Sequence, residues 1–159
     1  MKIGIDFGGV LSITDISGAE HRNVTINMPY AIESLHRLVD AGHKLYLISF
    51  CGKSRAYETC DSIEKHNVSR LFSGQYYVKK KESKGLICKK LGIQYMIDDC
   101  IEVLNNIELK NPSTRRLLFV ADDGWLDILT KLEEFDQIDE TDMDVTSLCY
   151  LIVSDTSCQ

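Results

Sequence analysis

Short apolar runs alternate with amphipathic stretches along most of this chain, and this alternation constrains the fold more than any other feature. Residues 44–49 read KLYLIS, a nearly continuous apolar run that is typical of a strand covered on both faces. The pattern predicts an α/β domain with a mainly parallel sheet. Strands are expected at 2–7, 44–49, 76–78, 93–97 and 117–120, with 148–153 as a candidate edge strand. Helices are expected between Pro29 and Gly42 and at 53–66, 84–91, 101–107 and 125–135.

Two of these helices carry recognisable apolar faces. The helix between Pro29 and Gly42 has a stripe of aliphatic side chains at helical spacing. The helix at 53–66 has small, aromatic and aliphatic residues at its inward positions. The stripe of the first consists of Ile32, Leu35, Leu38 and Val39, and the inward positions of the second are expected to be Ala56, Tyr57, Cys60 and Ile63.

The length of 159 residues suits one domain with its own core. No apolar run approaches the ~20 residues of a membrane span, and the first strand follows Met1 directly, so neither a leader nor a membrane partner is expected. We expect a single domain over 1–159, in which 12–28 form a flap-like segment and 136–159 an acidic C-terminal segment. The expected location is the cytoplasm, with the nucleus as an alternative.

Charge and cysteine content narrow the function classes. The formal charge of −6 disfavours a broad nucleic-acid surface, which needs clustered Lys and Arg, so nucleic acid is not an expected partner. The acidic stretch 133–144 is interpreted as a solvated segment, with an interaction tail as the alternative. The six cysteines form no CxxC pair, which favours reduced thiols over a disulfide framework.

Polar residues occur where the expected strands end. Asp6, Ser49 and the pair Asp98–Asp99 each follow an apolar run, and Lys84 opens the helix before the last of them. Alone, each has an ordinary explanation as a turn residue, a strand terminus, a helix cap or a surface lysine. Because the carboxyl ends of parallel strands meet at one edge of the sheet, where ligands bind in such folds, their common placement predicts one site.

The residue types at that edge favour phosphate chemistry. Three carboxylates in one place require a cation, and an all-oxygen ligand set suits Mg²⁺. Lys84, the Ser49 hydroxyl and free N–H groups in the Gly8–Gly9 loop could then bind a phosphate dianion. A carboxylate facing that phosphorus can act as a nucleophile and form an aspartyl-phosphate that water hydrolyses.

Four segments in this order resemble the haloacid dehalogenase-like (HAD) superfamily. They are GIDFGGVLS, LYLISF, a lysine ahead of a helix, and YMIDDCIEVL, and they span residues 3–107. The resemblance implies a three-layer Rossmann-like fold and Mg²⁺-dependent phosphatase activity. It implies Asp6 as nucleophile and metal ligand, Ser49 as phosphate donor and Lys84 as charge stabiliser, with Lys79, Lys80 and Lys81 as alternatives to Lys84. It also implies Asp98, Asp99 and the Gly8 carbonyl at the metal, and Gly8, Gly9, Ser49, Phe50 and Lys84 around the phosphate.

Gly8 departs from the pattern of this superfamily. Its hydrolases usually carry a second Asp at this position, which acts as general acid and base. General acid–base assistance contributes about 10²–10⁴ in rate, so proton transfer is expected to be weakened while metal and phosphate binding persist. Asp15, Glu20 and His21 are candidate substitutes, although each is better explained as a surface residue.

No stretch is long enough for a cap domain. Residues 10–29 leave room for a flap, and residues 52–82 are taken up by one helix and a short strand. An open site favours a large phosphorylated substrate, including a macromolecular one, or a neighbouring subunit that covers the site, so a homo-oligomer is an open alternative.

Several other features have ordinary structural explanations. The pair Asp122–Asp123 is interpreted as a helix cap ahead of a core Trp125 rather than a metal contact. Cys51 is interpreted as a small rim residue rather than a catalytic thiol. Lys79–Lys81, with Tyr76 and Tyr77, are interpreted as a solvated strand end rather than a steering patch. No metal spacing relates the histidines His21, His36, His43 and His66.

Two functions follow from the sequence. The first is a capless, Mg²⁺-dependent phosphohydrolase that works through an aspartyl-phosphate on Asp6. The alternative is a catalytically inactive HAD-like domain that binds a phosphate ligand or a protein partner, which the glycine at position 8 favours.

Overall fold

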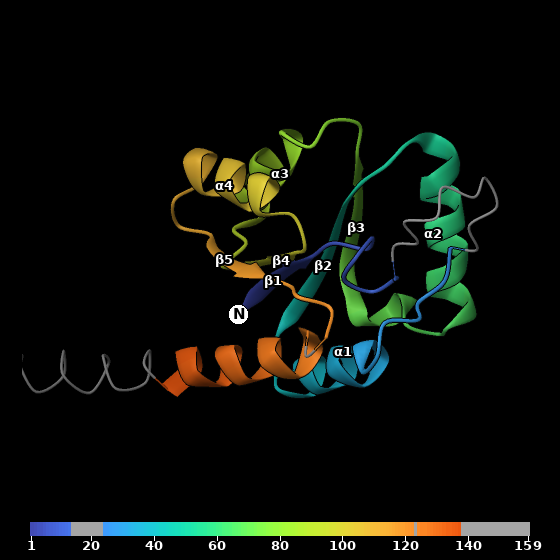
Figure 1. Ribbon diagram of the computed structural model, residues 1–159, viewed down its shortest axis with the longest axis horizontal. Coiled ribbons are helices and arrows are strands. Elements are labelled where there is room, and N and C mark those ends of the chain that lie inside the picture. The colour runs from blue at the N-terminus through green and yellow to red at the C-terminus, as the bar shows by residue number, and fades with distance from the viewer. Residues whose placement is uncertain (14–23, 123, 138–159) are drawn as a thin grey trace, which may run out of the picture. The chain divides into compact units, whose positions relative to one another are not determined.

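A computed structural model describes residues 1–13, 24–122 and 124–137 (Figure 1). The chain divides into two compact units, Met1–Trp125 and Leu126–Gln159. The first unit contains the sheet and the predicted site residues. No helix in the described ranges is both long and apolar enough to cross a membrane.

A five-stranded, all-parallel sheet forms the centre of the first unit (Figure 1). Its strand order is β3-β2-β1-β4-β5, so that β1 lies in the middle. The strands that follow β1 in the chain are added first on one side, as β2 and β3, and then on the other, as β4 and β5. The strands are β1 (Lys2–Ile5), β2 (Lys44–Phe50), β3 (Phe72–Val78), β4 (Tyr95–Asp98) and β5 (Arg115–Leu118).

Helices cover both faces of this sheet, as the alternating pattern predicts. They are α1 (Ala31–Asp40), α2 (Lys53–Lys65), α3 (Ser83–Leu91) and α4 (Ile101–Lys110), and a short 3₁₀ helix, η1, covers Ser69–Leu71. On the face under α3 and α4, the side chains of Ile48, Met96 and Leu104 share one buried cluster. Gly4 permits this close packing, because a Cβ there would lie 2.6 Å from the Met96 sulfur.

A further helix covers residues 124–137. In the second unit, Ile128, Leu129 and Leu132 are buried and share one face of this helix. Lys131 and Asp127, one turn apart, form an ion pair of 2.6 Å.

The α/β fold with a parallel sheet is confirmed, and the described residues contain no cap domain between β1 and α1 or between β2 and α3. One predicted inward residue of α2 is wrong, because Tyr57 is 67% exposed. Ile63 is buried as predicted, and the other buried positions of this helix are Thr59 and Ser62. β3 begins four residues before the predicted 76–78, because Phe72, Gly74 and Gln75 also pair with β2, while the register skips Ser73. The predicted strand 148–153 and most of the flap-like segment lie outside the described residues.

Candidate functional site

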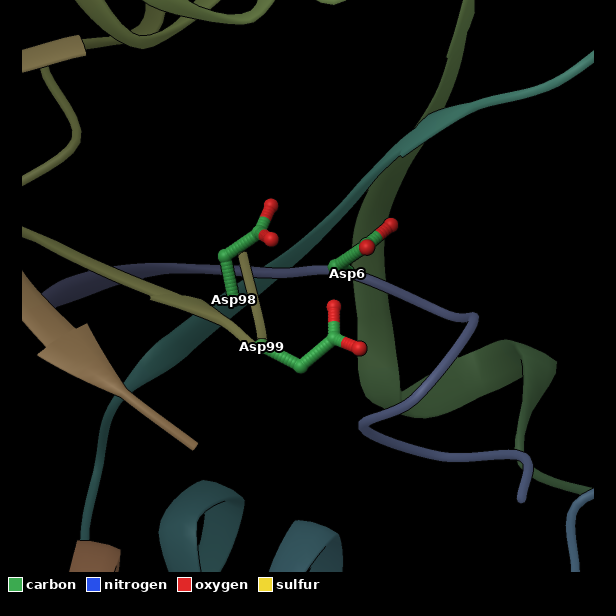
Figure 2. Close-up of side chains that lie close together, drawn as sticks. All are labelled: Asp6, Asp98 and Asp99. Atoms are coloured by element: carbon green, nitrogen blue, oxygen red, sulfur yellow. The ribbon is translucent and has the colours of Figure 1, made fainter. Parts of the chain in front are cut away.

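Three aspartates meet at the carboxyl edge of the sheet (Figure 2). Asp6 follows β1, Asp98 is the last residue of β4, and the register pairs Ile5 with Ile97, so the two aspartates lie side by side. Asp99 comes next in the chain, and one carboxylate oxygen from each of the three lies within 4.8 Å of the others. The structure therefore brings these three predicted residues together.

Lys84 connects two of these carboxylates. Its ammonium lies 3.1 Å from Asp6 Oδ1 and 2.6 Å from Asp98 Oδ2, and its side chain is only 2% exposed. A buried lysine is costly unless charged partners compensate, and here two do so. Lys79, Lys80 and Lys81 are exposed. The structure thus places Lys84, and not its three neighbours, between Asp6 and Asp98.

Backbone N–H groups hold the two buried carboxylates in place. The Phe7 N–H donates to Asp6 Oδ1 at 2.8 Å, and the Cys100 N–H donates to Asp98 Oδ1 at 2.9 Å. Charge-assisted bonds of this kind are strong and restrict the orientation of the carboxylate. Because Oδ1 of Asp6 is engaged by both Phe7 and Lys84, Oδ2 is the oxygen that remains for other chemistry.

Burial and mutual repulsion perturb the acid–base properties of the group. Burial raises the pKa of Asp6 to about 6, with Lys84 opposing the rise and Asp98 adding to it. Burial and then Asp98 also raise the pKa of Asp99. Burial alone would favour neutral Lys84, but Asp6 and Asp98 outweigh it and raise the pKa of its ammonium. The group therefore contains three carboxyl groups and one ammonium, which contacts two of them, and a divalent cation would correct this imbalance of charge.

The loop after Asp6 is a tight turn. The carbonyl of Phe7 accepts from the N–H groups of Val10, Leu11 and Ser12, and the Gly9 N–H donates to the Ser12 carbonyl at 2.8 Å. The expectation of a free N–H at Gly9 is therefore wrong, because the turn itself uses that donor. These bonds bracket Gly8, whose own N–H and carbonyl take part in none of them.

A distant residue also holds this loop. The indole N–H of Trp125 donates to the Val10 carbonyl at 2.9 Å, and its ring packs edge-on against Phe119 with the centroids 5.7 Å apart. Trp125 is 1% exposed, which agrees with its interpretation as a core residue. The link to Val10 was not predicted, since nothing local in the sequence signals a bond across 115 positions.

Gly8 and Gly9 differ sharply in what their positions allow. Gly9 has a left-handed φ of 78°, and a Cβ there would lie 1.9 Å from Asp99 Oδ2. Gly8 is outside the left-handed region, and apart from its chain neighbours no described residue has a heavy atom within 4 Å of a Cβ added there. Glycine is therefore required at position 9, because of the left-handed backbone and the close approach of Asp99, but not at position 8.

The two glycines predict opposite responses to alanine. Gly9→Ala is expected to destabilise the protein by about 1–3 kcal/mol and to displace Asp99, because the residue must leave the left-handed region or push the carboxylate away. The matched variant Gly8→Ala is expected to change the free energy of unfolding by less than ~1 kcal/mol. Chemical denaturation of both variants measures the difference, and equal losses would contradict it.

The other predicted residues fall at or near this edge. Ser49 is 5% exposed near the end of β2, and Phe50, the last residue of that strand, is 43% exposed. Burial and then Asp6 raise the pKa of the Cys51 thiol, so Cys51 lies near the site but is disfavoured as a thiolate. The four cysteines of the described ranges are free thiols: Cys51, Cys60, Cys88 and Cys100.

The weaker candidates do not join the group. Asp122 is exposed, and Asp123 lies outside the described residues, as do Asp15, Glu20 and His21. His66 lies at the end of α2, where its ring nitrogen contacts the Ser62 carbonyl at 2.8 Å. Within the described residues, Asp6, Asp98 and Asp99 are the one group of acidic, histidine or cysteine side chains arranged to hold a metal.

Comparisons with known proteins give structural similarity only. No protein-family model matches the sequence, and no curated protein does either. Among solved structures, the chain is similar to D,D-heptose 1.7-bisphosphate phosphatase from B. bronchiseptica, in a complex with magnesium and phosphate, with a TM-score of 0.62 and 10% identity. That match covers 84% of this chain and 98% of the phosphatase.

Two further structures are similar at the same level. A HAD-superfamily hydrolase from Ehrlichia chaffeensis matches with a TM-score of 0.53 and 15% identity, over 67% of this chain and 57% of the hydrolase. The chain therefore shares its fold with these two hydrolases. An uncharacterized protein from Listeria monocytogenes serotype 4b also matches, with a TM-score of 0.61 and 13% identity over 86% of this chain and 98% of that protein. In this shared fold, the three aspartates and Lys84 of the chain lie at the edge where ligands of parallel sheets bind.

Proposed function

We propose that the protein is a Mg²⁺-dependent phosphohydrolase that transfers a phosphoryl group from a phosphorylated substrate to Asp6 and then to water. The observation that carries the proposal is the arrangement of Asp6, Asp98 and Asp99 around a buried Lys84. The similar fold of a phosphatase in a complex with magnesium and phosphate supports it.

The donor set suits Mg²⁺. Asp6, Asp98 and Asp99 offer only carboxylate oxygens, and the Gly8 carbonyl is a further oxygen that the turn leaves free of its own bonds. Mg²⁺ prefers oxygen ligands and retains several waters, so a group of three carboxylates is sufficient. When bound, Mg²⁺ would supply positive charge for the phosphate oxygens.

Each residue of the site has its own role in the proposed reaction. Lys84 and the Phe7 N–H hold Asp6 Oδ1, so that Oδ2 is free to attack the phosphorus atom. The bond between phosphorus and the leaving-group oxygen breaks, and that oxygen takes a proton from water because Gly8 offers no acid. A water molecule then attacks the phosphorus, the bond to Asp6 breaks, and inorganic phosphate is released.

The same arrangement allows phosphate binding without turnover, and Gly8 is the observation that favours this second candidate. The two functions differ in one assay. Acetyl phosphate has a good leaving group and needs little help from an acid, so Mg²⁺-dependent release of phosphate from it supports the hydrolase. Calorimetric binding of inorganic phosphate with no such release supports the binding domain.

Binding of Mg²⁺ can be measured by thermal unfolding, independently of phosphate release. Mg²⁺ at about 100 times its dissociation constant is expected to stabilise the protein by about 2.7 kcal/mol, which corresponds to a rise of roughly 5–10 °C in Tm for a domain of this size. Asp99→Asn is expected to remove most of that rise, because it deletes one of the three carboxylates. Asp122→Asn is the matched control, since Asp122 is an exposed aspartate at the end of another strand region. Equal thermal shifts in both variants would contradict the assignment.

A further inference from the structure

An exposed aromatic ring borders the proposed phosphate site. Phe50 directly follows Ser49 at the end of β2 and is 43% exposed, whereas Ile48 and Ser49 before it are buried. A single exposed apolar side chain needs no explanation by itself. Phe50 is a candidate binding residue only if neighbouring side chains could bind the same ligand.

Lys81 provides that connection. Its ammonium lies 5.8 Å from the centroid of the Phe50 ring, within the range of a cation–π interaction. The carbonyl of Lys81 accepts a hydrogen bond from the N–H of Lys84 at 3.2 Å, and Lys84 bridges Asp6 and Asp98. Lys81 therefore contacts the Phe50 ring and lies one turn before the lysine of the site. Lys79 and Lys80 beside it are exposed as well, which concentrates positive charge on this rim of an otherwise acidic chain.

The neighbouring tyrosine on β3 is engaged in packing. The Tyr77 hydroxyl donates to Gln75 Oε1 at 3.0 Å and accepts from the Cys60 thiol of α2 at 3.2 Å. These bonds hold the Tyr77 ring beneath α2. Phe50 is thus the aromatic side chain beside Ser49 that is both exposed and accompanied by a cation.

The site also has space on its reacting side. Apart from the chain neighbours of Gly8, no described residue has a heavy atom within 4 Å of a Cβ placed there, and the described residues contain no cap domain. A substrate with a bulky group beyond its phosphate can therefore extend from Asp6 toward the rim without a clash at position 8.

We propose that Phe50 and Lys81 form a subsite for the aromatic base of a nucleotide-like phosphate monoester whose phosphate binds at Asp6. The base stacks on the exposed part of the Phe50 ring, and the Lys81 ammonium attracts the anionic ligand and holds the ring in place. The location of the phosphate rests on the proposed function, whereas the preference for an aromatic group rests on Phe50 and Lys81 alone.

Two ligands that differ only in the base test the subsite. Adenosine 5′-monophosphate and ribose 5-phosphate carry the same phosphate ester, and their dissociation constants are measured by calorimetry in Mg²⁺, which does not depend on turnover. The wild-type protein is expected to bind the nucleotide at least tenfold more tightly. Phe50→Leu, which keeps an apolar side chain, is expected to reduce this ratio to twofold or less.

The lysine is tested with a matched control. Lys81→Gln is expected to weaken both ligands three- to tenfold, and more at low salt than at high salt. Lys89→Gln removes an exposed lysine from the last turn of α3, which lies at the opposite end of that helix from Lys84, and is expected to change neither constant.

The outcomes separate the subsite from the proposed function. Equal affinities of the wild-type protein for the two ligands would overturn the subsite, as would a preference that Phe50→Leu leaves intact. Failure to detect binding of either ligand would overturn it too. The proposed function fails by a different readout, namely release of phosphate from acetyl phosphate that Asp6→Asn leaves unchanged. Circular dichroism and thermal unfolding verify that each variant is folded.

Discussion

Asp6→Asn is expected to reduce Mg²⁺-dependent phosphate release from acetyl phosphate and p-nitrophenyl phosphate by at least ~10³-fold. An amide at this position is nearly the same size as the carboxylate but cannot attack phosphorus, and loss of a nucleophile typically removes most of the rate enhancement of a covalent mechanism. The rate is measured as phosphate released per protein molecule, with free acetyl phosphate hydrolysis subtracted.

The control for this variant is Asp122→Asn, which makes the same chemical change at an exposed aspartate outside the group. A hydroxylamine-sensitive phosphoprotein that forms in the wild-type protein and is lost in Asp6→Asn would identify the covalent step directly. Similar rates for wild-type protein and Asp6→Asn would remove Asp6 from the reaction and leave phosphate binding as the function.

Gly8→Asp is expected to increase the rate by a factor of ~10² or more for substrates with poor leaving groups. The missing component is an acid that protonates the leaving-group oxygen, and such assistance contributes about 10²–10⁴. A side chain fits at this position without strain, because Gly8 lies outside the left-handed region and a Cβ there meets no described residue within 4 Å apart from its chain neighbours. Ribose 5-phosphate, with an alkoxide leaving group, is the substrate that should gain most.

Gly8→Asn is the matched control, because it fills the same space without supplying a proton at neutral pH. The gain for acetyl phosphate should be small in both variants, since its leaving group is already good. An equal gain from Asp and Asn would attribute the effect to shape, and no gain from Asp would mean that another group already supplies the proton or that the site is not competent for turnover.

The fold could be predicted from the sequence because its signals are local. A buried parallel strand such as β2 is a continuous apolar run, and Asp6 and Asp98 end such runs, so strand geometry alone brings them to one edge. The choice of Lys84 among four lysines followed from its place at the start of α3, and the ion pairs to Asp6 and Asp98 agree with that placement.

What could not be predicted depends on contacts between distant segments. The bond from Trp125 to Val10 and the close approach of Gly9 to Asp99 leave no local pattern. The donor at Gly9 was expected to face a ligand, but the turn consumes it. Tyr57 was placed inward by helical spacing, whereas the packing of α2 uses its smaller polar residues, Thr59 and Ser62.

Trp125 is a fluorescent probe of the loop after Asp6. It is the single tryptophan of the chain, it is buried, and its indole N–H is bonded to the Val10 carbonyl four residues beyond Asp6. Indole emission depends on hydrogen bonding and on the polarity around the ring. Tryptophan fluorescence therefore reports on the surroundings of this one ring, which include the loop after Asp6 and Phe119, so that ligand-induced movement next to the nucleophile can be followed in real time without a label.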